Sequence, residues 1–245
     1  RGDGLRMDLA VGARAVGTDR FYGHMLSRDA MTNDRLWPYP YLDNLATAGV
    51  VVDAKGDRFT DEGRGGVYIA NAIAKLPDPL AAVVVFDSAI WEAAGRAGLI
   101  PANPHLPAVG GTLVTGADLE ALARNLGMEP SRLNATVRAY NEASASRATL
   151  KLDPPRSTAR YAAQPIRLAP FYAVPACCGI TATMGGIAID EHARALREDG
   201  AAIPGLYVAG GAAGRLEGGP EIGYVGGLAK CGVTGLVAAE HIAAQ

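Results

Sequence analysis

The chain of 245 residues carries 23 lysines and arginines against 25 aspartates and glutamates, so its formal net charge is −2, and like charges form no run. This balance excludes the basic surface that nucleic acids or anionic membranes would need. No apolar stretch reaches the roughly 18 residues of a membrane span without a charge or a helix breaker. The three cysteines, at positions 177, 178 and 231, are too few for a disulfide scaffold and lack a zinc spacing, which predicts a reducing, cytoplasmic setting.

The first two thirds of the chain predict a helix followed by an α+β unit. Residues 1–16 mix polar and apolar residues in the manner of an amphipathic helix. In the unit that follows, "AGVVVDAKGDRFTDEG" predicts a strand, a turn and a second strand, and "AAVVVFD" predicts a buried strand. The segment "TGADLEALARNLGMEPSRLNATVRAYNEA" predicts two helices joined at 127–130, the first capped by Thr115 or Asp118 and the second by Ser131.

The last third of the chain is rich in glycine and begins with a strand pattern. "MGGIAIDEHARALREDGAAIPGLYVAGG" alternates as strands do around a two-residue turn at 199–200. The strand that ends at Val208 runs into a turn of small residues, 209–214, of the kind that lets a backbone approach a ligand closely. A glycine-dense loop, 210–227, and a final helix, 228–244, complete the chain.

Several of these segments together resemble one known family. "TATMGGIAIDEHARALREDGAAIPGLYVAGG" and "GYVGGLAKCGVTGLVAAEHIA" are similar to the C-terminal FAD-binding segment of the fumarate reductase/succinate dehydrogenase-type flavoproteins, a family that includes 3-ketosteroid and tricarballylate dehydrogenases. "GVVVDAKGDRFTDEG" and "DLEALARNLGMEPSRLNATVRAYNEA" look like that family's capping domain, and "GDGLRMDLAVGA" looks like the segment before the cap. The resemblance covers essentially the whole chain, and its combination of segments is more specific than any single one.

The resemblance implies a fold of mixed α/β and α+β type. The chain would hold the C-terminal half of a split Rossmann-like FAD-binding domain, with an inserted α+β capping domain. The implied ranges are the end of the N-terminal part at 1–16, the capping domain at 17–165 and the C-terminal FAD-binding segment at 166–245. The chain contains no G-x-G-x-x-G, the motif that binds the FAD pyrophosphate. We therefore expect an N-terminal half with a strand and this motif, encoded in the same gene or supplied by a partner chain.

The implied flavin site lies in the glycine-rich last third. Residues 226 and 227 are glycines at the start of the last helix, so the amides of its first turn can approach a flavin without side-chain obstruction. The alternative is that the glycines only permit tight packing of the helix against the sheet. The cofactor-binding residues implied by the family are Thr183, Met184, Gly185, Gly186, Ala209, Gly210, Gly211, Tyr224, Gly226, Gly227 and Leu228.

Candidate catalytic residues follow from the same resemblance. His24 aligns with a histidine that holds a substrate carboxylate in soluble fumarate reductases, although Met25 stands where they have proline. Glu62 and Arg64 fall in the family's proton-delivery region. The alternatives are a structural histidine and a solvated, charged turn. Tyr224 leads the phenols, ahead of Tyr22 and Tyr68, since a tyrosine can donate to a carbonyl oxygen.

Other residues of the glycine-rich loop and the cysteines are weaker candidates. Arg215, Glu217 and Glu221 share the loop of Tyr224. The adjacent Cys177 and Cys178 fit small core residues better than nucleophiles, because no helix start or histidine stands beside them in the sequence.

Two departures from the fumarate reductases bear on the substrate. Trp91 stands where those enzymes have an arginine, and "PEIGYVGG" offers Glu221, Ile222 and Tyr224 where they clamp a carboxylate with an arginine. Charge matching therefore disfavours a dicarboxylate. We expect an FAD-dependent oxidoreductase that dehydrogenates or reduces a C–C bond next to a carbonyl in a small organic or steroid-like molecule. The alternatives are a carboxylate-substrate dehydrogenase and a non-catalytic flavoprotein fragment or subunit that needs a partner chain.

Overall fold

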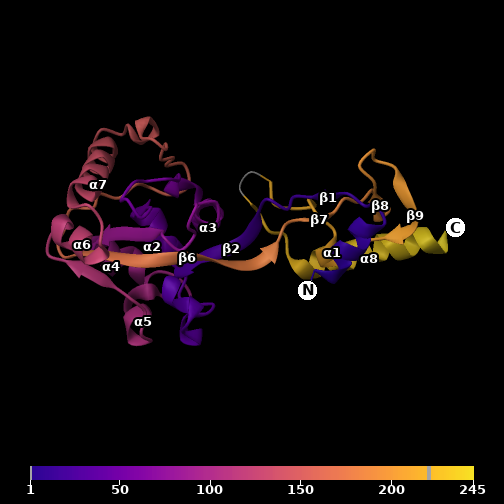
Figure 1. Cartoon of the computed structure of the whole chain (residues 1–245), viewed down its shortest axis with the longest axis horizontal. Helices are drawn as coiled ribbons and strands as arrows, with labels where there is room; N and C mark the ends of the chain where they lie inside the picture. Colours follow the sequence, from indigo (N-terminus) through magenta and orange to yellow (C-terminus); the bar gives the residue numbers. More distant parts are fainter. Residues whose placement is uncertain (1, 220–221) are drawn as a thin grey trace. The chain divides into compact units, whose positions relative to one another are not determined.

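The chain folds into two compact units. The computed structural model describes residues 2–219 and 222–245. Arg1–Tyr22 and Ile180–Gln245 form one unit, here called the terminal unit, and Gly23–Gly179 form the other, the central unit. Two strands, β2 (Phe21–Ser27) and β6 (Phe171–Thr183), carry the chain from one unit into the other (Figure 1).

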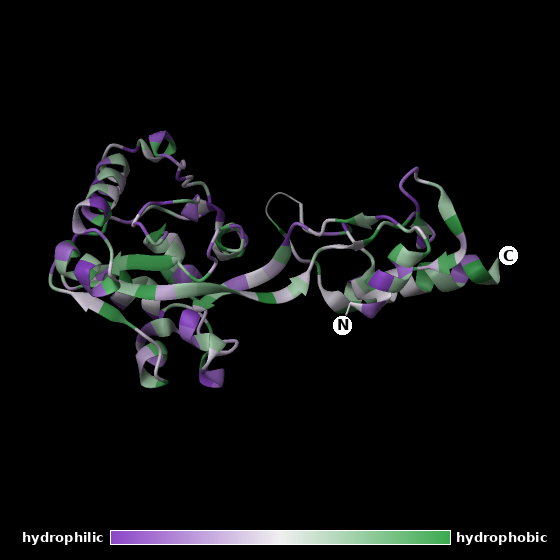
Figure 2. Ribbon diagram, viewed as in Figure 1, coloured by the Kyte–Doolittle hydropathy of each residue, from purple (hydrophilic) through white to green (hydrophobic). Residues whose placement is uncertain are grey.

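The central unit is built on a mixed α/β arrangement with a five-stranded sheet. Its strand order is β2-β6-β4-β3, and β5 (Val114–Gly116) also pairs with β6. Strand β3 (Val50–Val52) runs antiparallel to β4 (Val83–Asp87), and every valine of the two strands is buried. Figure 2 shows this hydrophobic centre in green. Valine has one strongly preferred rotamer and packs well on a pleated surface, so the predicted buried strand at 81–87 is confirmed.

The predicted strand–turn–strand at 48–63 is wrong in its second arm. After β3, the Asp53 carboxylate accepts the backbone N–H groups of Lys55 and Asp57 and closes the turn. In the described part of the chain, a single isolated bridge between Val52 and Arg58 follows, and no second strand forms. The chain turns instead into a short 3₁₀ helix, η3 (Glu62–Arg64). A side-chain ion pair between Arg58 and Glu62 holds this arm, in place of strand hydrogen bonds.

Six α-helices and four further 3₁₀ turns surround this sheet. α2 packs against β4 and α3, and α6 packs against α7 and β5. The α-helices are α2 (Asp43–Ala48), α3 (Gly66–Ile73), α4 (Ser88–Ala93), α5 (Ala102–Ala108), α6 (Leu119–Leu126) and α7 (Pro130–Ala145). The 3₁₀ turns are η1 (Arg28–Met31), η2 (Asp34–Leu36), η4 (Ala94–Arg96) and η5 (Thr149–Lys151).

The predicted helix pair of this unit is confirmed, with one corrected cap. Gly127 ends α6 with a positive φ of 70°, and the Asp118 carboxylate accepts the N–H of Ala121 at the start of that helix at 2.7 Å. Ser131 does not cap α7. Pro130 already occupies the first helical position, so the cap falls to Glu129, whose carboxylate accepts the Ser131 N–H at 3.4 Å.

The terminal unit begins with a shorter helix than the sequence predicts. α1 spans Asp3–Ala10, and Gly12, at a φ of 86°, leads the chain out of it. The next residues form β1 (Ala15–Val16), which pairs antiparallel with β7 (Gly186–Ile187). The predicted helix 1–16 is therefore wrong at its C-terminal end. Residues 15–16 instead pair with β7, a strand about 170 residues further along the chain.

The rest of the terminal unit follows the predicted pattern. Strands β8 (Arg194–Leu196) and β9 (Ala202–Tyr207) form a hairpin, and Gly200 takes a φ of 85° in its turn. The turn η6 (Gly210–Ala212) and the last helix, α8 (Gly227–Ala243), follow. A small core of alanine, valine and isoleucine side chains holds the unit together: Ala13, Ile187, Ala195, Ile203, Val208 and Ala213. No helix among the described residues is long and apolar enough to cross a membrane.

Candidate functional site

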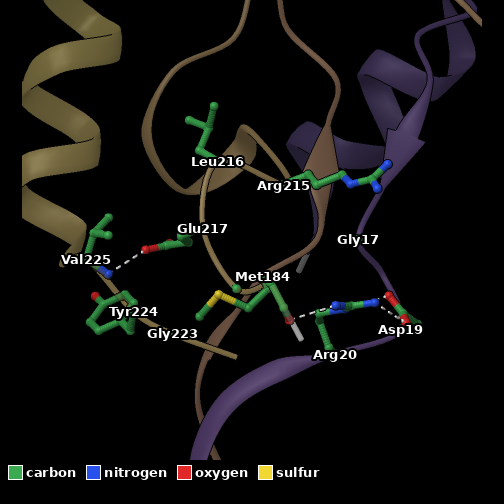
Figure 3. A pocket seen from close by; sticks show the side chains of 12 residues that line it. Gly17, Asp19, Arg20, Met184, Arg215, Leu216, Glu217, Gly223, Tyr224 and Val225 are labelled. Atoms are coloured by element: carbon green, nitrogen blue, oxygen red, sulfur yellow. Dashed lines mark hydrogen bonds and ion pairs between the residues drawn. The ribbon is translucent and has the colours of Figure 1, made fainter. Parts of the chain in front are cut away.

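A pocket of about 880 Å³ lies within the terminal unit (Figure 3). Three segments far apart in the sequence line it: residues 17–20, Met184, and the glycine-rich loop at 215–219 and 223–225. Of the predicted cofactor-binding residues, Met184 and Tyr224 line this pocket, and Gly226–Leu228 follow directly after its last lining residue. Asp19 and Arg20 were not predicted as site residues, because nothing in their local pattern connects them with a loop about 200 residues further on.

The N-terminus of α8 stands at the edge of this pocket. Gly226 precedes the helix with a φ of 104°, a conformation that favours glycine, and no side chain within the cap position accepts from the first turn. The Tyr224 hydroxyl instead accepts the N–H of Gly227 at 2.8 Å. The first amides of a helix carry a partial positive charge, so this end of α8 can stabilise a negatively charged ring edge.

Two of the predicted tyrosines meet in the terminal unit. The rings of Tyr22 and Tyr224 stack with centroids 4.9 Å apart. Tyr224 remains 40% exposed, while Met184 beside it is buried. Two of the three candidate tyrosines, Tyr22 and Tyr224, are therefore brought together from β2 and the loop before α8.

Ion pairs fix the loop that carries Tyr224. One carboxylate oxygen of Glu217 accepts the N–H of Val225 at 2.9 Å (Figure 3). The other accepts from the ammonium of Lys230 on α8 at 3.1 Å. The side chains of Glu217 and Lys230 are almost fully buried. Glu217 thus ties the loop to the helix and is not presented to a ligand.

Positive charge at the pocket comes from Arg20 and Arg215. The Arg20 guanidinium donates to the Gly219 carbonyl at 2.9 Å and pairs with Asp19, whose hydrogen bond raises the pKa of Arg20 above its usual value. Arg215 is exposed and takes a φ of 61°. Glu221, the third loop residue proposed from the sequence, lies outside the described residues, and Ile222 beside it is buried.

The predicted cofactor glycines divide into two groups. A Cβ on Gly186 would lie 2.3 Å from the Ala212 carbonyl oxygen, one on Gly185 would meet the Thr18 backbone at 2.7 Å, and one on Gly210 would meet the Cys231 sulfur at 2.7 Å. Packing therefore accounts for these three, and the Gly210 N–H also donates to Thr234 of α8. Beside Gly211 and Gly226, in contrast, an added Cβ would meet no described atom within 4 Å. Their backbones are open to a ligand. Gly227 belongs to neither group, since a Cβ there would lie 3.1 Å from the Tyr224 hydroxyl. The other members of the set, Thr183, Ala209 and Leu228, are exposed.

The other catalytic candidates lie in the central unit. His24, on β2, pairs with Asp43 of α2 at 2.7 Å. The Arg64 guanidinium lies 3.8 Å from the centre of the Tyr68 ring. Glu62 is fully buried, so the alternative of a solvated turn is wrong for this residue. Its carboxylate accepts from Arg58 and from the Val51 N–H, which favours a structural role over proton delivery.

Trp91 and Cys177 belong to the interior of the central unit. The Trp91 ring is buried against Phe86 and Tyr172, with centroids 5.8 and 5.9 Å away. Trp91, which stands where the fumarate reductases have an arginine, therefore packs in the core. Cys177 is buried, and burial raises the pKa of its thiol to about 11, as expected of a core residue.

Comparisons with known proteins agree on one family. A family model described as FAD binding domain matches residues 1–224. The chain is 30% identical over 271 residues to 4-oxocyclohexanecarboxylate 2-dehydrogenase of Sinomonas cyclohexanicum, covering 100% of this chain and 45% of that protein. It is 28% identical over 252 residues to the probable fumarate reductase Ifc3 of Shewanella frigidimarina, covering 99% of this chain and 38% of that protein. The chain thus spans less than half the length of these curated relatives.

A solved structure shares the fold. The 3-ketosteroid delta1-dehydrogenase from Sterolibacterium denitrificans matches with a TM-score of 0.72 and 24% identity, over 99% of this chain and 46% of that one.

The geometry of the terminal unit fits the cofactor that this family indicates. The open backbone at Gly211 and Gly226 leaves room for a ring system, and the α8 N-terminus offers donors to its electron-rich edge. The exposed Tyr224 ring supplies an apolar face beside them. The chain belongs to the FAD binding domain family, and FAD is its cofactor.

Proposed function

We propose that this chain is part of an FAD-dependent oxidoreductase that removes or adds hydrogen across a C–C bond next to a carbonyl, in a small organic or steroid-like substrate. In this proposal the terminal unit is the C-terminal half of a split Rossmann-like FAD-binding domain, and the central unit is the inserted α+β capping domain. The chain covers 45% of its dehydrogenase relative. We infer that a further segment, in the same gene or a partner chain, supplies the pyrophosphate motif.

The observation that carries the proposal is the N-terminus of α8 at the edge of the pocket. Bound FAD supplies a ring that accepts or donates a hydride. The Tyr224 hydroxyl takes the Gly227 N–H, so the amides of residues 226 and 228 would face the part of the ring where negative charge gathers on reduction. This arrangement stabilises the reduced form and so strengthens the oxidant, which suits a dehydrogenase.

Tyr224 would act on the substrate carbonyl. Its hydroxyl oxygen already accepts the Gly227 N–H, and the hydroxyl proton is left to donate elsewhere. A hydroxyl that accepts one hydrogen bond becomes a stronger donor in the next, because the bonds polarise one another. A proton donor at the carbonyl oxygen favours loss of hydrogen from the adjacent carbon, since the oxygen gains negative charge in that step.

The substrate class rests on a relative and on the charges of the pocket. The name 4-oxocyclohexanecarboxylate 2-dehydrogenase combines a ring ketone with a carboxylate. The exposed Arg215 at the pocket is the one observation that favours a carboxylate on the substrate. The fumarate reductase relative keeps a dicarboxylate substrate as the second candidate. Glu217 and Lys230 neutralise each other, which leaves Arg215 and the Asp19-paired Arg20 as the positive groups of the described lining.

Anaerobic mixing of a ring ketone with the flavin-loaded protein, including the segment that carries the pyrophosphate motif, tests this function. We expect 4-oxocyclohexanecarboxylate to bleach the visible flavin absorption, because its ketone acidifies the neighbouring hydrogens. Cyclohexanecarboxylate, the matched compound without the oxo group, should leave the spectrum unchanged. Equal bleaching by both compounds would exclude a role for the carbonyl. A protein that holds flavin and is reduced by neither compound would favour the non-catalytic alternative.

A further inference from the structure

In the central unit, the ring of His24 is held both by a hydrogen bond and by a stack on another ring. It is the fourth residue of β2, and its side chain is 17% exposed. Its Nδ1 lies 2.7 Å from a carboxylate oxygen of Asp43, and its ring stacks on Tyr41 with centroids 3.9 Å apart and an angle of 11°. The hydrogen bond fixes which edge of the ring faces Asp43, and the stack on Tyr41 fixes the plane of the ring.

The Asp43 carboxylate is itself fixed at its other oxygen. That oxygen accepts the backbone N–H of Met25 at 2.9 Å, which ties the start of α2 to β2. A backbone N–H cannot turn away, so this carboxylate cannot rotate without losing the bond. The ring of His24 therefore meets an oxygen whose position is set by the main chain.

The residue opposite Asp43 makes room for it. A Cβ on Gly66, the first residue of α3, would lie 2.0 Å from the Asp43 carboxyl carbon. No side chain caps α3 at Gly65, and the positive end of this eight-residue helix stabilises a nearby carboxylate. The position of Asp43 is thus determined by β2, α2 and α3 together.

We propose that Asp43 is a positioning residue that holds the His24 proton on Nδ1 and so directs the acid–base chemistry of this ring to Nε2. A carboxylate oxygen accepts and does not donate, so the nitrogen that faces it carries the hydrogen. In the neutral ring Nε2 then accepts a hydrogen bond, and in the charged ring it donates one while Asp43 stabilises the charge. This inference rests on the proposed function and adds to it a part for His24 with the substrate, but the position of the proton can be measured without any reaction.

The tautomer of His24 is read directly by long-range ¹H–¹⁵N correlation of the ¹⁵N-labelled protein. The chain has four histidines, so a His24→Gln variant identifies the signal. The spectrum is recorded about 2 pH units above the ordinary histidine value of about 6.5, where imidazoles are neutral. We expect the proton of His24 on Nδ1.

Asp43→Asn should reverse the tautomer without removing the contact. The Met25 N–H retains the amide oxygen of the new side chain, which turns its NH₂ group toward His24. The ring nitrogen must then accept, and the proton moves to Nε2. Asp53→Asn is the matched control: its carboxylate also accepts backbone N–H groups but has no histidine beside it, so all four histidine signals should stay as they are. A proton on Nε2 in the parent protein, or an unchanged tautomer in Asp43→Asn, would overturn the proposal.

A double-mutant cycle on flavin reduction separates positioning from general structure. We expect Asp43→Asn to slow reduction about 10- to 100-fold, the scale of the loss when the hydrogen-bond partner of a metal-ligating histidine is removed. If Asp43 acts through His24, it should cost nothing more in the His24→Gln background. Additive losses would contradict that route. A reversed tautomer with unchanged rates in both single variants would refute the role of His24 in the reaction and leave its positioning by Asp43 in place.

Discussion

The hydroxyl and the ring of Tyr224 make different contacts, and a single substitution removes the first and keeps the second. Tyr224→Phe keeps the stack on Tyr22 but loses the acceptor for the Gly227 N–H. We expect the flavin to remain bound and its reduction by substrate to slow by about 10²–10³-fold, if the hydroxyl donates to charge that develops in the transition state. Stopped-flow absorbance of the flavin measures this rate.

Tyr224→Phe should also lower the stability of the fold, and this effect has to be measured separately from the effect on flavin reduction. Loss of a cap costs about 0.5–2 kcal/mol of unfolding free energy, so urea unfolding should register the missing hydrogen bond at α8. Tyr207→Phe is a matched control, since its hydroxyl bonds to His241 and does not line the pocket. A Tyr224→Phe rate within about threefold of the parent would remove this residue from the mechanism.

Burial distinguishes the three cysteines. Burial raises the pKa of Cys177 to about 11, it raises that of the half-buried Cys178 above its usual value, and Cys231 is exposed on α8. The thiolate is the reactive form of cysteine. A raised pKa therefore lowers the thiolate fraction, and with it the reactivity, at every pH below that pKa. The reactivity recovers only as the pH approaches the raised pKa. We expect iodoacetamide at about pH 8 to label Cys231 in the folded chain and to leave Cys177 unmodified. Mass spectrometry of the digested protein reports both, and rapid labelling of Cys177 would show that its site opens.

Gly210 and Gly211 are adjacent in the turn η6 but have different surroundings. Gly210 has a φ of 63°, and an added Cβ would meet the Cys231 sulfur, whereas Gly211 has open space around it. We expect Gly210→Ala to lower the free energy of unfolding by about 1–3 kcal/mol through strain. Gly211→Ala should leave stability within about 0.5 kcal/mol.

Flavin affinity is a second measurement that separates the roles of Gly210 and Gly211 in the turn η6. If the flavin approaches the open backbone of η6, Gly211→Ala should weaken flavin binding although it does not destabilise the fold. Equilibrium titration followed by flavin fluorescence measures the affinity. Unchanged affinity in Gly211→Ala would mean that this turn only supports α8, to which Gly210 is bonded through Thr234.

For the whole molecule, the charge of the pocket bears on the choice between two substrate classes. Glu217 and Lys230 neutralise each other, and Arg20 is paired with Asp19. We expect the flavin-loaded protein to oxidise or reduce fumarate and succinate far more slowly than a ring ketone, because a dicarboxylate needs two cationic clamps. Oxidation of the reduced flavin by fumarate at a comparable rate would overturn this choice. Arg215→Gln should then abolish that reaction if Arg215 is the clamp.

Local sequence patterns determined the elements whose cause is local. The valine runs at 50–52 and 83–85 form strands because β-branched residues favour them, and Gly127 and Gly200 end a helix and form a turn with positive φ. The family resemblance, carried by segments spread over the chain, gave the cofactor. The tyrosine of the glycine-rich loop was also identifiable from its place before the helix.

Long-range contacts decided the rest. Residues 15–16 are a strand because β7 pairs with them, and the arm after Asp53 is irregular because a buried ion pair between Arg58 and Glu62 holds it. The role of each glycine also depended on what stands opposite: Cys231 requires Gly210, and Asp43 requires Gly66. Only the fold brings Asp43 to His24 and Tyr22 to Tyr224, because a pattern of neighbours along the chain carries no record of which side chains meet across it.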